Sequence, residues 1–247
     1  MLLVTYLVGV TLRARQGDLP AWVAPFGVLW LFGYLCFNAA TLWLKAAPVR
    51  RRDYVLPVLV YGTISGLAGL MTLILGGWHL LWWLPLFVPL LIAALVLAVG
   101  RRERSIASGL ATIIAVSLAI PLLRFDTPQS IWQRWDDATR TDLLIALAVF
   151  CYFFGTVVHV KAMIRERLQR HSLIRSVAWH LGCLITVIAL ATPGLVSWWW
   201  TPVFALAALR AWWMPDQATR GRSFSALQIG VTEIVLSALV AGVALAG

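Results

Sequence analysis

The sequence predicts an all-α fold, a polytopic bundle of transmembrane helices. Its 247 residues are 61% apolar and only 12% charged, whereas soluble domains are about 45–50% apolar. Several apolar runs reach roughly 20 residues, the length that a helix needs to cross a bilayer. They lack the alternating pattern of barrel strands, so helices are expected to satisfy the backbone hydrogen bonds within the membrane.

Taken in order, the apolar runs predict eight full spans in a single transmembrane domain, 1–247. The segment "MLLVTYLVGVTL", near 1–12, comes before them. It is too short to cross a bilayer at about 1.5 Å per residue. We interpret it as the second half of a first span that is truncated, which makes nine spans in the full-length form. The full spans are expected near 21–44, 54–76, 79–99, 105–123, 142–163, 173–193, 195–214 and 225–246.

The basic residues alternate between the two sides of this bundle. When the partial span is counted as the first, the loops after spans two, four, six and eight hold 15 of the 20 Lys and Arg residues. The positive-inside rule places these loops in the cytoplasm, with the amino end cytoplasmic and the carboxyl end external. Because the charge lies in loops, the net charge of +10 does not indicate nucleic-acid binding. The 15 residues are Lys45, Arg50, Arg51, Arg52, Arg101, Arg102, Arg104, Lys161, Arg165, Arg167, Arg170, Arg175, Arg210, Arg220 and Arg222.

Two spans carry a polar stripe at helical spacing. Polar groups are costly in hydrocarbon and usually face a bundle interior or a wet cavity, so both stripes are candidate sites. Alternatively, these side chains bond to their own helix, join helices together or reach the headgroups. His159 and Glu166 are the candidate proton-transfer residues. The candidate substrate-binding residues are Tyr34, Asn38, Thr41, Lys45 and Arg50 near span two, and Tyr152, Lys161 and Arg165 near span six, where Thr156 continues the stripe.

Three further polar residues lie inside predicted spans: His180 in span seven, and Gln228 and Glu233 in span nine. An intramembrane carboxylate is a candidate functional group by default. Pairing of Glu233 with a basic group or with His180 is an equally open interpretation. The glycines of span three, Gly62, Gly66 and Gly69, are expected to allow close helix packing.

The sequence indicates no cofactor and no metal. It lacks the phosphate-binding loop, the nucleophile elbow and the zinc-binding helix motif. Cys36, Cys151 and Cys183 fall inside apolar spans without the paired spacing of a disulfide framework or a zinc site.

Three segments, "GYLCFNAATLWLKAAPVRRRDYVLPVLVYG", "FFGTVVHVKAMIRER" and "LQIGVTEIVLS", carry a family resemblance. Together they resemble the YwiC-like family of bacterial membrane proteins, whose function is uncharacterised. The resemblance implies a location in the bacterial cytoplasmic membrane. It also implies an upstream segment of the form H-G-A-W-A-M, and so a truncated start.

A weaker similarity concerns architecture. Two regions around Lys45 and Lys161 suggest an internal duplication, which is similar to UbiA-type intramembrane prenyltransferases. Those enzymes hold magnesium through aspartate-rich motifs. Here the matching places carry Asn38 and Lys45, and His159 with its basic neighbours. This departure argues against diphosphate–magnesium chemistry.

These observations leave three functions open, and with them whether the protein is an enzyme. The first is binding or modification of an anionic, amphipathic, lipid-like substrate at the cytoplasmic ends of spans two and six, with Lys45, Arg50, Lys161 and Arg165 holding the anion. The second is a small proton-coupled transporter that uses Glu233 and His180. The third is a non-catalytic accessory or assembly protein. Membrane lipids are the expected partners, and no particular protein partner is indicated.

Overall fold

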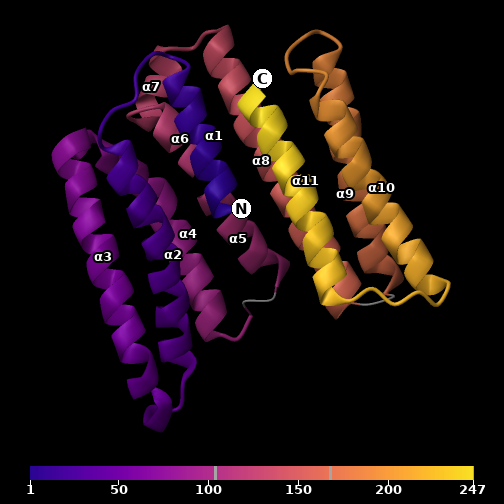
Figure 1. Ribbon diagram of the computed structural model, residues 1–247, viewed down its shortest axis with the longest axis horizontal. Coiled ribbons are helices and arrows are strands. Elements are labelled where there is room, and N and C mark those ends of the chain that lie inside the picture. The colour runs from indigo at the N-terminus through magenta and orange to yellow at the C-terminus, as the bar shows by residue number, and fades with distance from the viewer. Residues whose placement is uncertain (103–104, 167–168, 247) are drawn as a thin grey trace. The chain divides into compact units, whose positions relative to one another are not determined.

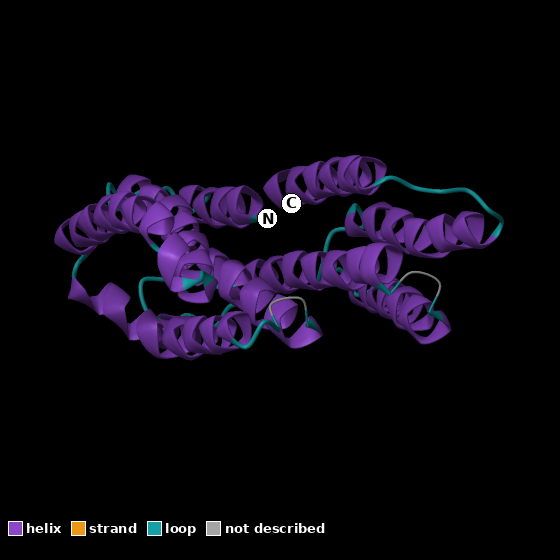
Figure 2. Ribbon diagram, turned by 90° about the horizontal axis from the view of Figure 1, so that it is seen from below, coloured by secondary structure: helices purple, strands orange, loops and turns teal. Residues whose placement is uncertain are grey.

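The computed structural model describes residues 1–102, 105–166 and 169–246. Throughout these ranges the regular elements are helices joined by loops, without a strand (Figure 2). This confirms the all-α prediction. The chain forms two compact units, an amino-terminal unit, Leu2–Trp135, and a carboxy-terminal unit that starts at Asp136. Each is described by itself.

In the amino-terminal unit, neighbouring helices pack in pairs. Helix α2 lies along α3 (Figure 1), α4 lies along α5, and α1 packs on α6. The bounds are α1 Leu2–Ala14, α2 Val23–Lys45, α3 Arg52–Gly76, α4 Leu84–Val99, α5 Ile106–Ser117, α6 Ala119–Arg124 and α7 Pro128–Gln133, with 3₁₀ turns η1 Pro48–Arg50 and η2 Trp78–Trp83.

The short helix α1 is fixed at two points. Gly9 allows close approach to α6, because a Cβ there would lie 2.8 Å from Leu123 Cδ1. Arg13 is buried and forms ion pairs of 2.7 Å with Asp18 and 2.9 Å with Asp126. The segment expected to be part of a first span is therefore a helix docked within this unit.

Local signals set several helix ends. Gly77 ends α3 with a φ of +90°, a conformation that favours glycine. The side chains of Ser105, Thr127 and Asp136 accept hydrogen bonds from backbone N–H groups at the starts of α5, α7 and α8. Such N-caps satisfy donors that the first helical turn leaves unpaired.

The carboxy-terminal unit contains four long helices. Helix α9 packs along α10, while α8 contacts α9 and α11. Large apolar side chains between the helices, including Phe153, Trp200 and Phe204, are almost fully buried. The bounds are α8 Asp137–Val160, which continues into a π-helical turn η3 Lys161–Arg165, then α9 Arg170–Ala191, α10 Trp200–Thr219 and α11 Ala226–Ala246.

The predicted number of full spans needs a correction. Within the described ranges, seven helical segments are long and apolar enough to cross a membrane, not eight. The predicted span 195–214 corresponds to α10, which begins at Trp200 and carries Arg210 and Asp216. These charged residues reduce its apolar character. Two basic residues used to predict orientation, Arg104 and Arg167, lie outside the described residues.

Candidate functional site

The carboxy-terminal unit contains a buried ion pair between two helices. Arg210 of α10 donates a hydrogen bond through its Nη1 to the Oε1 of Glu233 of α11, and the two side chains form an ion pair. Thr156 of α8 donates a 2.8 Å hydrogen bond to the Oε2 of Glu233. Arg210 and Glu233 are only 6% and 9% exposed. Both carboxylate oxygens therefore have a partner, and three helices meet at one charge.

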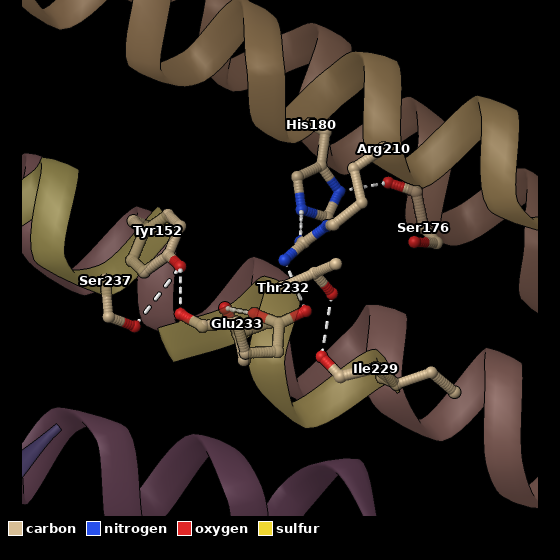
Figure 3. Close-up of polar contacts among 9 residues, drawn as sticks. Tyr152, Ser176, His180, Arg210, Ile229, Thr232, Glu233 and Ser237 are labelled. Atoms are coloured by element: carbon tan, nitrogen blue, oxygen red, sulfur yellow. Dashed lines mark hydrogen bonds and ion pairs between the residues drawn. The ribbon is translucent and has the colours of Figure 1, made fainter. Parts of the chain in front are cut away.

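His180 of α9 completes the contacts of this pair. Its Nε2 lies 3.2 Å from Arg210 Nη2, and its Nδ1 lies 2.7 Å from the carbonyl oxygen of Ser176. A guanidinium only donates and a carbonyl only accepts, so the geometry requires a proton on Nδ1 and a lone pair on Nε2. The guanidinium thus lies between a carboxylate and a neutral imidazole (Figure 3).

A second histidine lies beside the first. His159 of α8 is 0% exposed, and its ring centroid is 6.2 Å from that of His180. Among the described residues, neither of its ring nitrogens has a hydrogen-bond partner. A neutral imidazole has one donor and one acceptor, and burying them unpaired costs free energy. His159 therefore brings unused hydrogen-bonding capacity to the cluster.

Tyr152 connects α8 to α11 on the other side of Glu233. Its hydroxyl lies 3.3 Å from the carbonyl oxygen of Glu233 and 3.3 Å from Ser237 Oγ (Figure 3). We call Tyr152, Thr156, His159, His180, Arg210 and Glu233 the buried polar cluster. It joins all four long helices of the unit.

Small residues make this approach possible. A Cβ on Gly155 would lie 2.9 Å from His180 Nε2 and 3.0 Å from Trp179 Cδ1. The indole of Trp179 donates in turn to the carbonyl oxygen of Cys151 at 3.0 Å. Glycine at position 155 therefore lets α9 bring His180 against α8.

Comparisons with known proteins assign the chain to a family. The model of the YwiC-like protein family matches residues 1–123. The uncharacterized protein YwiC of Bacillus subtilis (strain 168) is 27% identical over 235 residues, which cover 95% of this chain and 88% of that protein. The chain belongs to the YwiC-like family. No solved structure matches it, and the similarity to UbiA-type enzymes stays a prediction.

For this YwiC-like chain, the predicted stripe of span six divides into two groups. Tyr152, Thr156 and His159 enter the buried polar cluster. Glu166 instead lies beyond η3, where it pairs with Lys161 at 2.9 Å and Arg175 at 3.0 Å. Ser172 also donates to its carboxylate. These partners, Ser172 first, hold the pKa of Glu166 below its ordinary value. Arg165 ends the π-turn.

The predicted stripe of span two belongs to the amino-terminal unit. Asn38 donates to the carbonyl oxygen of Tyr34, and Thr41 donates to that of Asn38, at 3.2 and 2.8 Å. These bonds stay within α2, as the alternative interpretation expects for such side chains. Lys45 ends the same helix and Arg50 ends η1.

Two residues differ from their expected surroundings. Gln228 is exposed and caps α11, where its Oε1 accepts a hydrogen bond from Ser225 N and Ser225 Oγ accepts one from Gln228 N.

Arg210 was predicted to be a loop residue, and this is wrong, because it is buried in the middle of α10. The signal that could have found it is its position inside the apolar run "TPVFALAALRAWW".

Proposed function

We propose that the protein is a small membrane transporter that couples uptake of an anionic solute to proton movement, with the buried polar cluster as its coupling site. The observation that carries the proposal is the Arg210–Glu233 pair, buried and bordered by His180 and His159. Intramembrane ionisable residues are rare and usually mark solute or proton pathways.

The proposed coupling follows from the charges. A proton that reaches Glu233 removes the negative charge that holds Arg210. The guanidinium then keeps its positive charge and its planar set of donors, which suit a carboxylate or phosphate. His159 has ring nitrogens to offer to a water or to the solute. Proton and anion would thus enter the site together.

The proposed setting is the cytoplasmic membrane of a bacterium. We place the basic loops in the cytoplasm, with the amino end cytoplasmic and the carboxyl end external. Although α10 carries two charges, its packing along α9 and its length of 20 residues support a place in the membrane. At about 1.5 Å per residue, it reaches roughly the thickness of the hydrocarbon core.

An uptake assay tests the proposal. Full-length protein in liposomes is given radiolabelled phosphate, lactate or glutamate, with and without an inward proton gradient. We expect the gradient to increase uptake of at least one anion by tenfold or more. Glu233→Gln should abolish the dependence on the gradient, and Arg210→Met should abolish uptake. Asp216→Asn, a matched change of an acidic residue on α10 that pairs with the exposed Arg220, should behave like the wild type.

A double variant separates transport from folding. Removing one partner of a buried pair costs about 3–5 kcal/mol, whereas replacing both with apolar residues is often neutral. Arg210→Met with Glu233→Leu should therefore be about as stable as the wild type but inactive. Gradient-dependent uptake by Glu233→Gln, or no response of any probe anion to the gradient, would contradict the proposal.

The other two functions remain alternatives. Binding of a lipid-like substrate at the ends of spans two and six has less support, because Lys161, one of the proposed anion-binding residues, is already paired with Glu166. The stripes concerned lie in different units. An accessory role is favoured if the double variant complements a deletion strain, since that variant keeps the fold and lacks the coupling site.

A further inference from the structure

The amino-terminal unit contains a cavity of about 430 Å³. Side chains from α2, α3, η2, α4 and α5 line it, including Phe26, Trp30, Tyr34, Trp83 and Phe87. No charged residue lies on its wall within the described part of the chain. Cavities of roughly 300–1,000 Å³ with apolar walls are typical of sites for small molecules.

Two of the residues that line the cavity carry a hydrogen-bond donor without a partner. The indole Nε1 atoms of Trp30 and Trp83 are buried, and neither finds an acceptor among the residues that the structure describes. Trp83 is only 2% exposed. Buried polar groups normally have a partner, so each exception requires an explanation.

Two threonines on the wall already have hydrogen-bond partners. Thr72 donates to the carbonyl oxygen of Ala68 at 2.8 Å, and Thr112 donates to that of Ser108 at 2.9 Å. Trp30 is held in place by Phe26, whose ring centroid is 5.8 Å away, and by Phe87 at 6.1 Å. The wall thus combines an apolar surface with the hydroxyl of Tyr34 and with two tryptophans, whose indole N–H groups can only donate.

We propose that this cavity binds an uncharged, membrane-soluble molecule with an apolar body and a carbonyl oxygen, which accepts a hydrogen bond from Trp83 or Trp30. An ion would find no opposite charge on the wall, and an alkane would leave the indoles unpaired. The carbonyl could belong to an isoprenoid-type quinone or to the ester of an acyl chain. This site is separate from the buried polar cluster, which lies in the other unit.

Binding to full-length protein in detergent tests the proposal. The probes are a benzoquinone with a decyl tail, methyl laurate, and decylbenzene, which lacks an acceptor oxygen. Apparent affinities come from the shift of the unfolding temperature with probe concentration, because a ligand of the folded state raises it. The probe that binds more tightly, quinone or ester, identifies the source of the carbonyl.

Variants connect the affinity to the cavity. Loss of one hydrogen bond should weaken binding about threefold to tenfold, so we expect this loss for the carbonyl probe in Trp83→Phe or Trp30→Phe. The affinity for decylbenzene should not change in either. Trp82→Phe, at the exposed neighbour in η2, is the matched control and should bind like the wild type.

A filled cavity gives an independent check. Ala115 lines the wall, and Ala115→Phe should fill the cavity and abolish binding of every probe. Circular dichroism should show that the helix content of this variant is unchanged. The proposal is overturned if neither carbonyl probe binds, if both Trp→Phe variants bind as tightly as the wild type, or if Ala115→Phe still binds.

Discussion

At the scale of single residues, Gly155 decides whether the buried polar cluster can form. The two side chains that it faces are both held by hydrogen bonds, His180 by Ser176 and Arg210, and Trp179 by the carbonyl oxygen of Cys151. Neither can move away without losing a bond. An added methyl group would therefore separate α8 from α9 rather than displace one flexible side chain.

Gly155→Ala is expected to destabilise the protein by about 1–3 kcal/mol, the usual cost of overpacking a close contact. The matched control is Gly182→Ala on α9, where an added Cβ meets no atom within 4 Å among the described residues. This control should be neutral or stabilising by up to about 1 kcal/mol, because alanine favours helices. Thermal unfolding in detergent measures both. Equal stability of the two variants would refute the close contact.

The glycines also show what sequence could and could not predict. The spacing of Gly62, Gly66 and Gly69 predicted close helix packing. Helix α3 does pack along α2, but this packing does not require glycine at the three positions. A Cβ on Gly62 or Gly69 would lie at an ordinary 3.5 Å from its nearest neighbour, and one on Gly66 meets nothing within 4 Å in the described chain. Closer contacts occur at other glycines, for example between Gly9 and Leu123 and between Gly155 and His180. Their partners are distant in sequence, so local spacing has no information about them.

At the scale of elements, periodicity predicted the polar face of α8 but not its end. The spacing of Tyr152, Thr156 and His159 placed them on one side of a helix, as found. Glu166 continues that period in an ideal α-helix, but the π-turn η3 breaks it. Beyond this turn, Glu166 contacts Lys161, Arg175 and Ser172 instead of the buried polar cluster. A repeat of 3.6 residues could not reveal it.

Glu166 should make the stability of this turn depend on pH. Its pKa lies below the ordinary 4.5, chiefly because Ser172 donates to the carboxylate and then because Lys161 does. A lowered carboxyl pKa stabilises the fold above the ordinary value, and the contribution is lost as the pH falls through the lowered pKa. Backbone amides of η3 should therefore lose protection from hydrogen exchange as the pH drops below 4.5.

The comparison variant is Glu166→Gln. It should exchange faster than the wild type at pH 7, and the difference should vanish in acid once exchange is corrected for its intrinsic rate. Asp137→Asn, which removes an exposed ion pair with Arg140 at the start of α8, should leave η3 unchanged. A pH-independent difference between Glu166→Gln and the wild type would contradict a role for the ionised carboxylate.

At the scale of the whole molecule, composition was sufficient for the fold class and insufficient for the site. Apolar runs predicted the helices because length and hydropathy are local properties. The sequence did not identify Arg210 as the partner of Glu233, because a count of Lys and Arg does not distinguish residues in loops from residues buried in a helix. Arg210 was counted as a loop residue for this reason, although it ends up 6% exposed in the carboxy-terminal unit.

The place of Arg210 also affects the predicted orientation of the chain in the membrane, since α10 must cross the membrane for the proposed topology to hold. The connection between α9 and α10 should then be external, and the one between α10 and α11 cytoplasmic. The test uses a variant without Cys36, Cys151 and Cys183, to which a single cysteine is added at Thr192 or at Ser223, both exposed. A membrane-impermeant maleimide is applied to intact cells.

Thr192→Cys should react in intact cells, and Ser223→Cys only after the membrane is permeabilised. The physical reason is the positive-inside rule, because the basic residues Arg220 and Arg222 adjoin Ser223 and none lies between Ala191 and Trp200. Reaction at both positions would mean that α10 does not cross. It would also remove Arg210 from the membrane interior, and with it the low-dielectric surroundings on which the proposed coupling of proton and anion depends. Reaction at Ser223 alone would leave the cluster in place and reverse the direction from which the anion enters.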